Sequence, residues 1–319
     1  MQRLESFDIL KGIGILLMIV GHLLMGQGTR ILDFIYSFHM PLFFIVTGYF
    51  YKQEPLSTLI KKNRDQLLFP YLVMCFIIIV LTQIQQPHEY EVDLIRTIKG
   101  MGPGWFLLSM FWARLWFHCI LKITPRYYLG VSLIVSTIVC FIANYHTIPP
   151  SFSFFPSLVG LFFLSVGYYI RISSLLNFDK RYSPIYTSLG VLFWLTISSY
   201  GKVRMSECIF KLSIIDFLGS ILGTFIAYEL SLLIDRSNNS IRTILSIAGR
   251  YSLVILFFHS IDYCVSIWYY CVPIWNQIDP YLPHSILLFL ILLVRLLFVT
   301  VCVYITLKIN ILRHFFKIK

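Results

Sequence analysis

The segment SILLFLILLVRLLFVTVCVYITL, residues 285–307, decides the fold class of this chain. It holds one charged residue, Arg295, in 23 positions, and a helix of this length crosses the ~30 Å hydrocarbon core of a bilayer. The same composition extends outward from it: 58% of the 319 residues are apolar, 13% are charged, and the mean hydropathy is +0.78. A soluble domain carries about 25% charged residues. The sequence therefore predicts a polytopic membrane protein and excludes an ordinary soluble enzyme or a nucleic-acid-binding domain.

Ten segments meet the requirement of about 20 mostly apolar residues for a membrane-spanning helix. They are residues 9–25, 33–51, 67–84, 104–121, 127–144, 154–171, 184–200, 212–234, 251–271 and 285–307. None alternates with the period of two that a membrane β-strand shows, so an all-α helical bundle is expected. We expect residues 1–319 to form a single integral membrane domain with no soluble domain.

The distribution of basic residues predicts the orientation of the bundle. The net charge is +11, and membrane proteins concentrate Lys and Arg in their cytoplasmic loops. With the N-terminus inside, 18 of the 26 Lys and Arg residues fall on the cytoplasmic side. Both termini are therefore expected in the cytoplasm. The positive charge is explained by membrane topology and membrane lipids, and no nucleic-acid partner is expected.

Ionisable residues inside a span are costly, so each is a candidate functional group. Lys11 and His22 are eleven residues apart on the first span, which returns them to one face of a helix at an axial separation of about 16 Å. Lys11 then lies at the cytoplasmic boundary, and Asp8, three residues earlier, is expected to pair with it. The alternatives are a topological anchor for Lys11 and an interfacial histidine for His22.

His39 lies towards the outer end of the second span, at a depth similar to that of His22. Two histidines facing one cavity could share acid–base work, because the imidazole titrates near neutral pH. The alternative is a histidine that only hydrogen-bonds a neighbouring helix.

Deeper charges occur in three later spans: Arg114 in the fourth, His259 and Asp262 in the ninth, and Arg295 in the tenth. An unpaired Asp or Arg at this depth is costly. Asp262 is therefore expected to pair with Arg114 or with Arg295. The pair has two interpretations, a structural ion pair or part of a polar cavity that contacts substrate.

Known hydrolytic and metal motifs are missing from the sequence. It contains no phosphate-cradling glycine loop, GxSxG elbow or HExxH helix. The seven cysteines form no CxxC pair and no Cys/His cluster with zinc spacing, so neither a metal site nor a bound cofactor is expected.

Four motifs resemble the acyltransferase 3 family of bacterial membrane O-acyltransferases. They are FDILKGIGILLMIVGH (7–22), YSFHMPLFFIVTGYFY (36–51), GPGWFLLSMF (102–111) and GRYSLVILFFH (249–259). The family signature, a basic residue, ten others and then histidine, falls on Lys11 and His22. Lys11 stands where many members have Arg, and the variant with Lys is similar to the fucose 4-O-acetylase-like branch.

The resemblance implies transfer of an acetyl group from cytoplasmic acetyl-CoA to a sugar hydroxyl of a surface polysaccharide, such as O-antigen, capsule or exopolysaccharide, or of its lipid-linked precursor. It also implies a multi-pass protein of the bacterial inner membrane. His22 would act as general base or carry the acyl group briefly, assisted by His39 or His259.

The remaining candidates divide into two groups. Lys11, Asp8 and Arg250 are candidate contacts for the acyl donor. Arg114, Asp262, Arg295 and Trp105 are candidate contacts for the substrate or its oxyanion, or members of a structural ion pair. A different class of function, a proton-coupled transporter or flippase for a glycan or lipid, also suits buried His, Asp and Arg.

Overall fold

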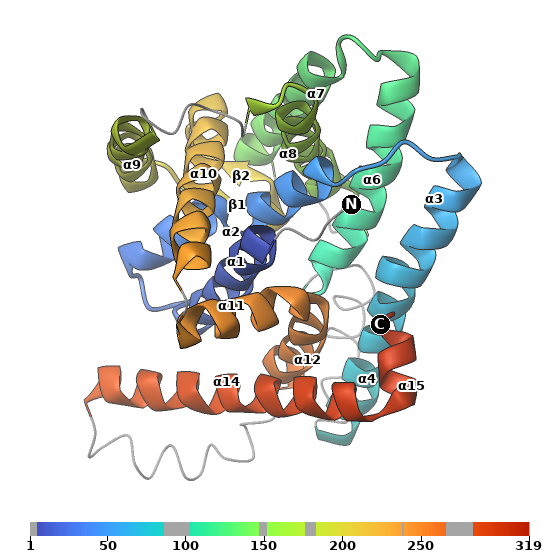
Figure 1. The fold of residues 1–319 in the computed structure, drawn as a ribbon, viewed down its shortest axis with the longest axis vertical. Helices are drawn as coiled ribbons and strands as arrows, with labels where there is room; N and C mark the ends of the chain where they lie inside the picture. Colours follow the sequence, from blue (N-terminus) through green and yellow to red (C-terminus); the bar gives the residue numbers. More distant parts are fainter. Residues whose placement is uncertain are drawn as a thin grey trace.

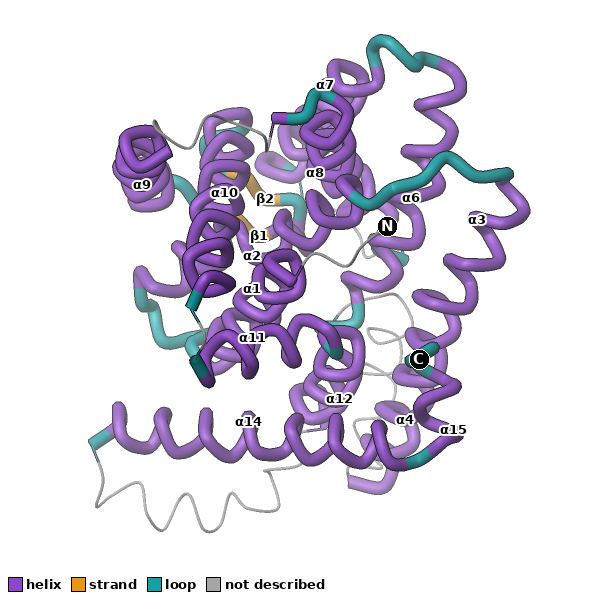
Figure 2. The backbone as a smooth tube through the Cα atoms, in the orientation of Figure 1, coloured by secondary structure: helices purple, strands orange, loops and turns teal. Residues whose placement is uncertain are grey.

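The computed structural model describes residues 5–85, 102–146, 152–175, 183–237, 239–265 and 283–318, and nearly all of these are helical (Figures 1 and 2). The helices in the N-terminal half are α1 (Glu5–Leu23), α2 (Arg30–Tyr49), α3 (Leu56–Asn63), the π-helix η1 (Arg64–Leu68), α4 (Phe69–Gln85), α6 (Trp105–Ile123), α7 (Tyr128–Tyr145) and α8 (Phe154–Ile172). Those in the C-terminal half are α9 (Ser183–Tyr200), α10 (Ile214–Arg236), α11 (Ser240–Arg250), α12 (Ser252–Val265), α14 (His284–Lys308) and α15 (Asn310–Phe315). The prediction of an all-α polytopic membrane protein is confirmed.

A small hairpin precedes α10. Its strands β1 (Val203–Arg204) and β2 (Ile209–Phe210) are antiparallel and enclose the 3-10 turn η3 (Met205–Glu207). Burial raises the pKa of the Cys208 thiol in this hairpin, so the side chain acts as a small buried hydrophobe.

Eight helical segments of the described chain are long and apolar enough to cross a membrane. A ninth is obtained if α11 and α12, which meet at an angle of 75°, are counted together, and α9 contributes a shorter apolar helix, Ile185–Tyr200. Each of the ten predicted spans coincides with one of these elements. The number of crossings and the cytoplasmic location of the termini remain predictions.

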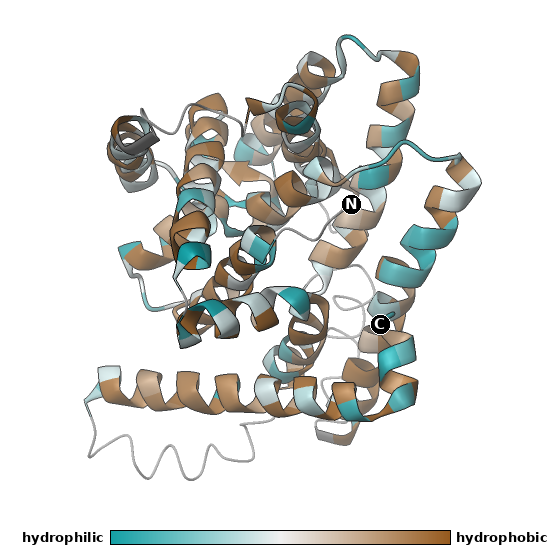
Figure 3. Ribbon diagram, in the orientation of Figure 1, coloured by the Kyte–Doolittle hydropathy of each residue, from teal (hydrophilic) through white to brown (hydrophobic). Residues whose placement is uncertain are grey.

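Two boundaries differ from the sequence-based prediction. Residues 240–250, which were expected to connect two spans, form the amphipathic helix α11. The third span begins earlier, because α3, η1 and α4 form one helical segment, Leu56–Ile84. Figure 3 shows that hydrophilic residues gather on α3, which explains why the apolar pattern began only at residue 67. The last residues of the ninth predicted span, 266–271, lie outside the described residues.

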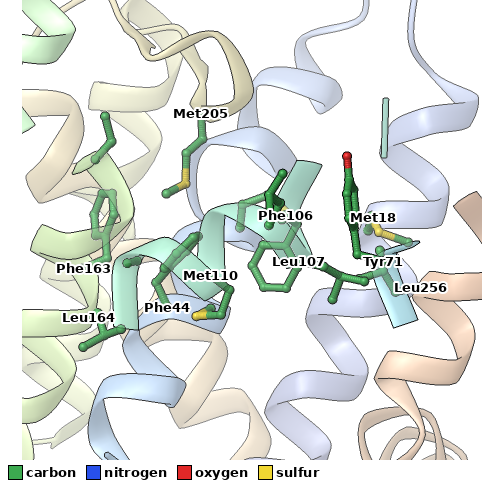
Figure 4. Packing of buried hydrophobic residues seen from close by; sticks show 14 of the residues in the cluster. Met18, Phe44, Tyr71, Phe106, Leu107, Met110, Phe163, Leu164, Met205 and Leu256 are labelled. Atoms are coloured by element: carbon green, nitrogen blue, oxygen red, sulfur yellow. The ribbon is translucent and has the colours of Figure 1, made fainter. Parts of the chain in front are cut away.

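The interior is built around α1, α2 and α8, while α7 and α14 expose most of their length. Figure 1 shows α14 lying across one edge of the molecule, where it packs on α12. The main core joins Met18, Tyr71, Phe106, Leu107 and Leu256, which come from the four helices α1, α4, α6 and α12 (Figure 4). This core holds α12 against α1 and α4, and so places the middle of α12 beside the end of α1.

Glycines allow the closest helix crossings. A Cβ at Gly48 of α2 would overlap the Leu164 carbonyl of α8, and one at Gly167 of α8 would overlap the Ile45 carbonyl of α2. A Cβ at Gly12 of α1 would overlap the Leu245 carbonyl of α11. Small residues at such crossings let helix backbones approach each other in membranes.

Candidate functional site

A pair of histidines joins α1 to α12. His22 Nδ1 lies 2.9 Å from His259 Nε2, and the two rings are close to parallel, with centroids 5.1 Å apart. His22 is the penultimate residue of α1 and stays partly accessible, whereas His259 is fully buried. Because a hydrogen bond needs one N–H and one lone pair, the two rings share a single proton between these nitrogens. The pair can therefore relay a proton without becoming two adjacent cations.

Helical spacing on α12 adds two further groups to this site. Asp262 and Tyr263 follow His259 by three and four residues, so all three lie on one face. The Tyr263 ring lies 4.8 Å from the His22 ring, and its hydroxyl donates to Met25 Sδ at 3.3 Å. Asp262 Oδ2 lies 3.6 Å from Arg295 Nε of α14. The prediction that Asp262 pairs with Arg295 is confirmed.

Arg114, the other predicted partner of Asp262, has different electrostatic neighbours. Its electrostatic partners are Tyr51 and Glu54, which follow the end of α2. Arg295, in contrast, lies within electrostatic range of both His22 and His259. The choice between the two arginines follows from helix packing, because α14 packs directly on α12.

His39 faces the same region from α2. Its Nδ1 donates to the Ile35 carbonyl at 2.9 Å, and since a carbonyl only accepts, the proton of the neutral ring lies on Nδ1. The lone pair of Nε2 then points away from its own helix turn. His39 is buried and lies within electrostatic range of His22, so the two predicted histidines are brought together.

Lys11, Asp8 and Arg250 gather at the other end of α1. Lys11 Nζ lies 2.8 Å from Asp8 Oδ1, which confirms the predicted pair. Asp8 is buried, while the Lys11 side chain is 27% accessible and can still meet a ligand. The exposed Arg250 follows Gly249, whose α-carbon packs against the backbone of Asp8 and Gly12. The basic groups are therefore about 16 Å along α1 from His22.

Trp105 opens α6 and is partly buried. Gly102, three residues earlier, lies beside the Cys264 side chain near the end of α12, since a Cβ there would be 3.6 Å from the sulfur. The start of α6 is thus close to the end of α12 that carries Asp262. The indole stacks edge-on with Phe106, at 6.2 Å between centroids. Its role as a substrate contact remains a prediction.

Two tyrosines of this region were not predicted. Tyr263 contacts His22, and Tyr36 lies with its ring 5.1 Å from His39. The Tyr36 hydroxyl is buried with no hydrogen-bond partner in the part of the chain that the structure describes. Helical spacing could have predicted both tyrosines. Tyr263 is four residues after His259, and Tyr36 is three residues before His39, so each shares a helix face with a histidine.

The donor set at this site is suited to proton transfer. It offers imidazole nitrogens that can accept or donate, two phenols and one ion pair. No group of three His, Cys, Asp or Glu side chains that could hold a metal ion occurs within the described ranges.

Comparisons with known proteins give the family. Nodulation protein NolL of Mesorhizobium japonicum is 33% identical over 122 residues, which cover 33% of this chain and 33% of that protein. The match thus spans about a third of that relative's length. No solved structure matches the chain. An acyltransferase domain model, that of the acyltransferase 3 family, matches residues 4–307. This match covers nearly the whole sequence, including every motif described above, and the chain therefore belongs to the acyltransferase 3 family.

Proposed function

We propose that this protein is an O-acetyltransferase of the bacterial inner membrane. It would move an acetyl group from cytoplasmic acetyl-CoA to a sugar hydroxyl of a cell-surface polysaccharide or of its lipid-linked precursor. The observation that carries this proposal is the hydrogen-bonded pair of His22 and His259, in which His22 lies on the same helix as Lys11. Family membership supports an acyl donor and an acceptor in general terms.

His22 is suited to act as the general base. If its Nδ1–H donates to His259 Nε2, the lone pair of His22 Nε2 is free to accept the proton of a sugar hydroxyl. The hydroxyl oxygen then attacks the thioester carbonyl, the C–S bond breaks, and the thiolate takes the proton back from His22. His259 would stabilise the imidazolium formed in between, because it accepts the remaining N–H.

Arg295 is suited to stabilise the oxyanion of the tetrahedral intermediate. It lies within electrostatic range of both histidines and is oriented by Asp262. A preorganised positive charge in a site that excludes water stabilises developing negative charge strongly. Arg295 would then be a catalytic residue and Asp262 its positioning residue.

The donor would enter at the end of α1 that carries Lys11 and Arg250. These basic side chains are accessible and can meet the phosphates of coenzyme A, while Asp8 holds the Lys11 ammonium in place. The acetyl thioester would then reach along α1 towards His22. Lys11 binds a phosphate as a point charge, without the bidentate geometry of Arg.

The proposal is tested with His22→Ala in a strain whose surface glycan is analysed for acetyl content. We expect acetylation to be abolished at unchanged membrane abundance, because the general base is lost. His314→Ala, an exposed histidine of α15, is the matched control and should leave acetylation intact. Undiminished acetyl content in His22→Ala would overturn the proposal. Movement of a glycan across the membrane that is independent of acetylation would instead support a carrier.

The donor side is tested with Lys11→Ala and Lys11→Arg. We expect Lys11→Ala to raise the KM for acetyl-CoA by about 10-fold or more, because one charge-assisted contact is lost, with little change in the KM for the acceptor. Lys11→Arg keeps the charge and should stay close to wild type. An unchanged KM for acetyl-CoA in Lys11→Ala would contradict the assignment of Lys11 to the donor.

A further inference from the structure

A second group of buried polar side chains lies where α2, α6 and α8 end. The Tyr51 hydroxyl and His118 Nδ1 are 3.1 Å apart, and Arg171 Nη1 of α8 donates to the Tyr51 carbonyl. Arg114 lies one helical turn before His118 on the same face of α6, within electrostatic range of Tyr51. The site described above uses none of these residues. We call Arg114, His118 and Tyr51 the α6 basic cluster.

Two nitrogens of the α6 basic cluster are buried without a hydrogen-bond partner among the described residues: Arg114 Nε and His118 Nε2. His118 is only 2% exposed. A guanidinium N–H can only donate and stays charged, so leaving it desolvated and unpaired is costly. Arg114 as a whole keeps partial exposure, which leaves a route for a ligand.

The surrounding charges do not neutralise this cluster. Among the described residues, Glu54 is the one acidic residue within electrostatic range of Arg114, and both of its carboxylate oxygens lie 2.6 Å from Lys62 Nζ. Lys122 follows His118 by one further turn and lies within its electrostatic range. Positive charge is therefore in excess at this end of α6, and a ligand that fits must be an anion.

Tyr51 favours the tautomer of His118 that an anion needs. A phenol keeps its proton at neutral pH, so the Tyr51 hydroxyl can donate. When that hydroxyl donates to Nδ1, the proton of neutral His118 lies on Nε2. Arg114 Nε and His118 Nε2 then present two N–H donors on one helix face, and neither has an acceptor in the described part of the chain.

We propose that the α6 basic cluster binds a phosphate group. Phosphate oxygens accept several hydrogen bonds at once, and Arg recognises them with charge and geometry together. The group can belong to a soluble nucleotide such as coenzyme A or to the headgroup of an anionic phospholipid at the membrane surface. Either source meets the same donors. The proposal does not depend on the proposed acetyl transfer, because it concerns binding alone.

The test uses the full-length protein in neutral maltoside micelles with two probes, coenzyme A and phosphatidylglycerol. Calorimetry measures the affinity for coenzyme A, and thermal unfolding measures stabilisation by phosphatidylglycerol. The variant is Arg114→Met, which fills the same space without a charge. It should unfold at a higher temperature than wild type when no ligand is present, because an unpartnered buried guanidinium is removed.

We expect Arg114→Met to weaken binding of at least one probe by about 10- to 100-fold, the range for a lost charge-assisted hydrogen bond. Loss of coenzyme A binding alone identifies a nucleotide phosphate, and loss of the phosphatidylglycerol effect alone identifies a lipid headgroup. Arg126→Gln, the matched control, removes an exposed positive charge from the α6–α7 connection. It should change neither the affinity for coenzyme A nor the stabilisation by phosphatidylglycerol.

Arg114→Lys keeps the positive charge but loses the planar guanidinium group, so it should weaken binding of the same probe by a smaller factor. This variant gives the readout if Arg114→Met does not fold. Wild-type protein that binds neither probe overturns the proposal. Variants with wild-type affinity for both probes overturn it too.

Discussion

The contact between α1 and α11 makes a strong prediction about Gly249. A Cβ at this position would overlap the Asp8 carbonyl oxygen, and it would lie 2.6 Å from the carbonyl carbon of Asp8 and 2.7 Å from the Gly12 nitrogen. All of these atoms belong to the backbone of α1, so no side-chain rotation can relieve the overlap. In Gly249→Ala the two helices must separate by roughly 1–2 Å to restore van der Waals distances. Lys11 and Arg250 would separate with them.

Gly249→Ala should lower the free energy of unfolding by about 3 kcal/mol, the upper end of the range for an overpacked side chain. For a chain of this size that corresponds to a fall in Tm of roughly 5 °C or more. The matched control is Gly130→Ala in α7, where a Cβ would meet nothing within 4 Å. There the substitution should stabilise the protein by up to about 1 kcal/mol, since Ala favours the helix over Gly.

Thermal unfolding of the detergent-solubilised protein, followed by tryptophan fluorescence, measures both variants. Binding of coenzyme A by Gly249→Ala should weaken as well, because the two basic groups at the end of α1 are displaced. Equal Tm values for Gly249→Ala and wild type would show that α11 does not pack on α1 in this way. The placement of Arg250 beside Lys11 would then have to be abandoned.

Three further predictions concern the histidine site. His259→Asn removes the partner of His22 and should lower kcat by about 100-fold or more with little change in KM for the acyl donor, as measured by steady-state kinetics; a change confined to KM would contradict a positioning role. Asp262→Asn leaves Arg295 without its counter-ion and should cost about 3–5 kcal/mol in thermal unfolding, most of which the additional change Arg295→Met should recover; additive losses would argue against the pair. Tyr263→Phe keeps the ring beside His22 and should retain most acetyl transfer, whereas Tyr263→Ala should lose most of it. Equal activities of the two variants would show that packing of this ring against His22 is not needed for transfer.

The fold class could be read from the sequence because the bilayer imposes a local requirement. A span needs about 20 apolar residues in succession, and each segment that met this condition coincides with a helix. Helix α11 was missed because it is amphipathic and short, so it does not meet the condition. The early start of the third span was missed for the same reason, since α3 is largely exposed and hydrophilic.

Side-chain pairs within one helix could also be predicted. Lys11 and Asp8 are three residues apart, and the helix itself brings them together. The same reasoning would have found Tyr263 beside His259 and Tyr36 beside His39.

An all-α membrane fold, the approximate positions of its helices and the Lys11–Asp8 pair could thus be predicted from the sequence alone. Only the packing of the helices showed that His259 hydrogen-bonds His22 and that Arg295 lies beside Asp262. The physical reason is that hydropathy and helical phase are properties of one segment. Contacts between segments hundreds of residues apart depend on how closely two helix surfaces can approach, and here glycines such as Gly12 and Gly249 set that approach.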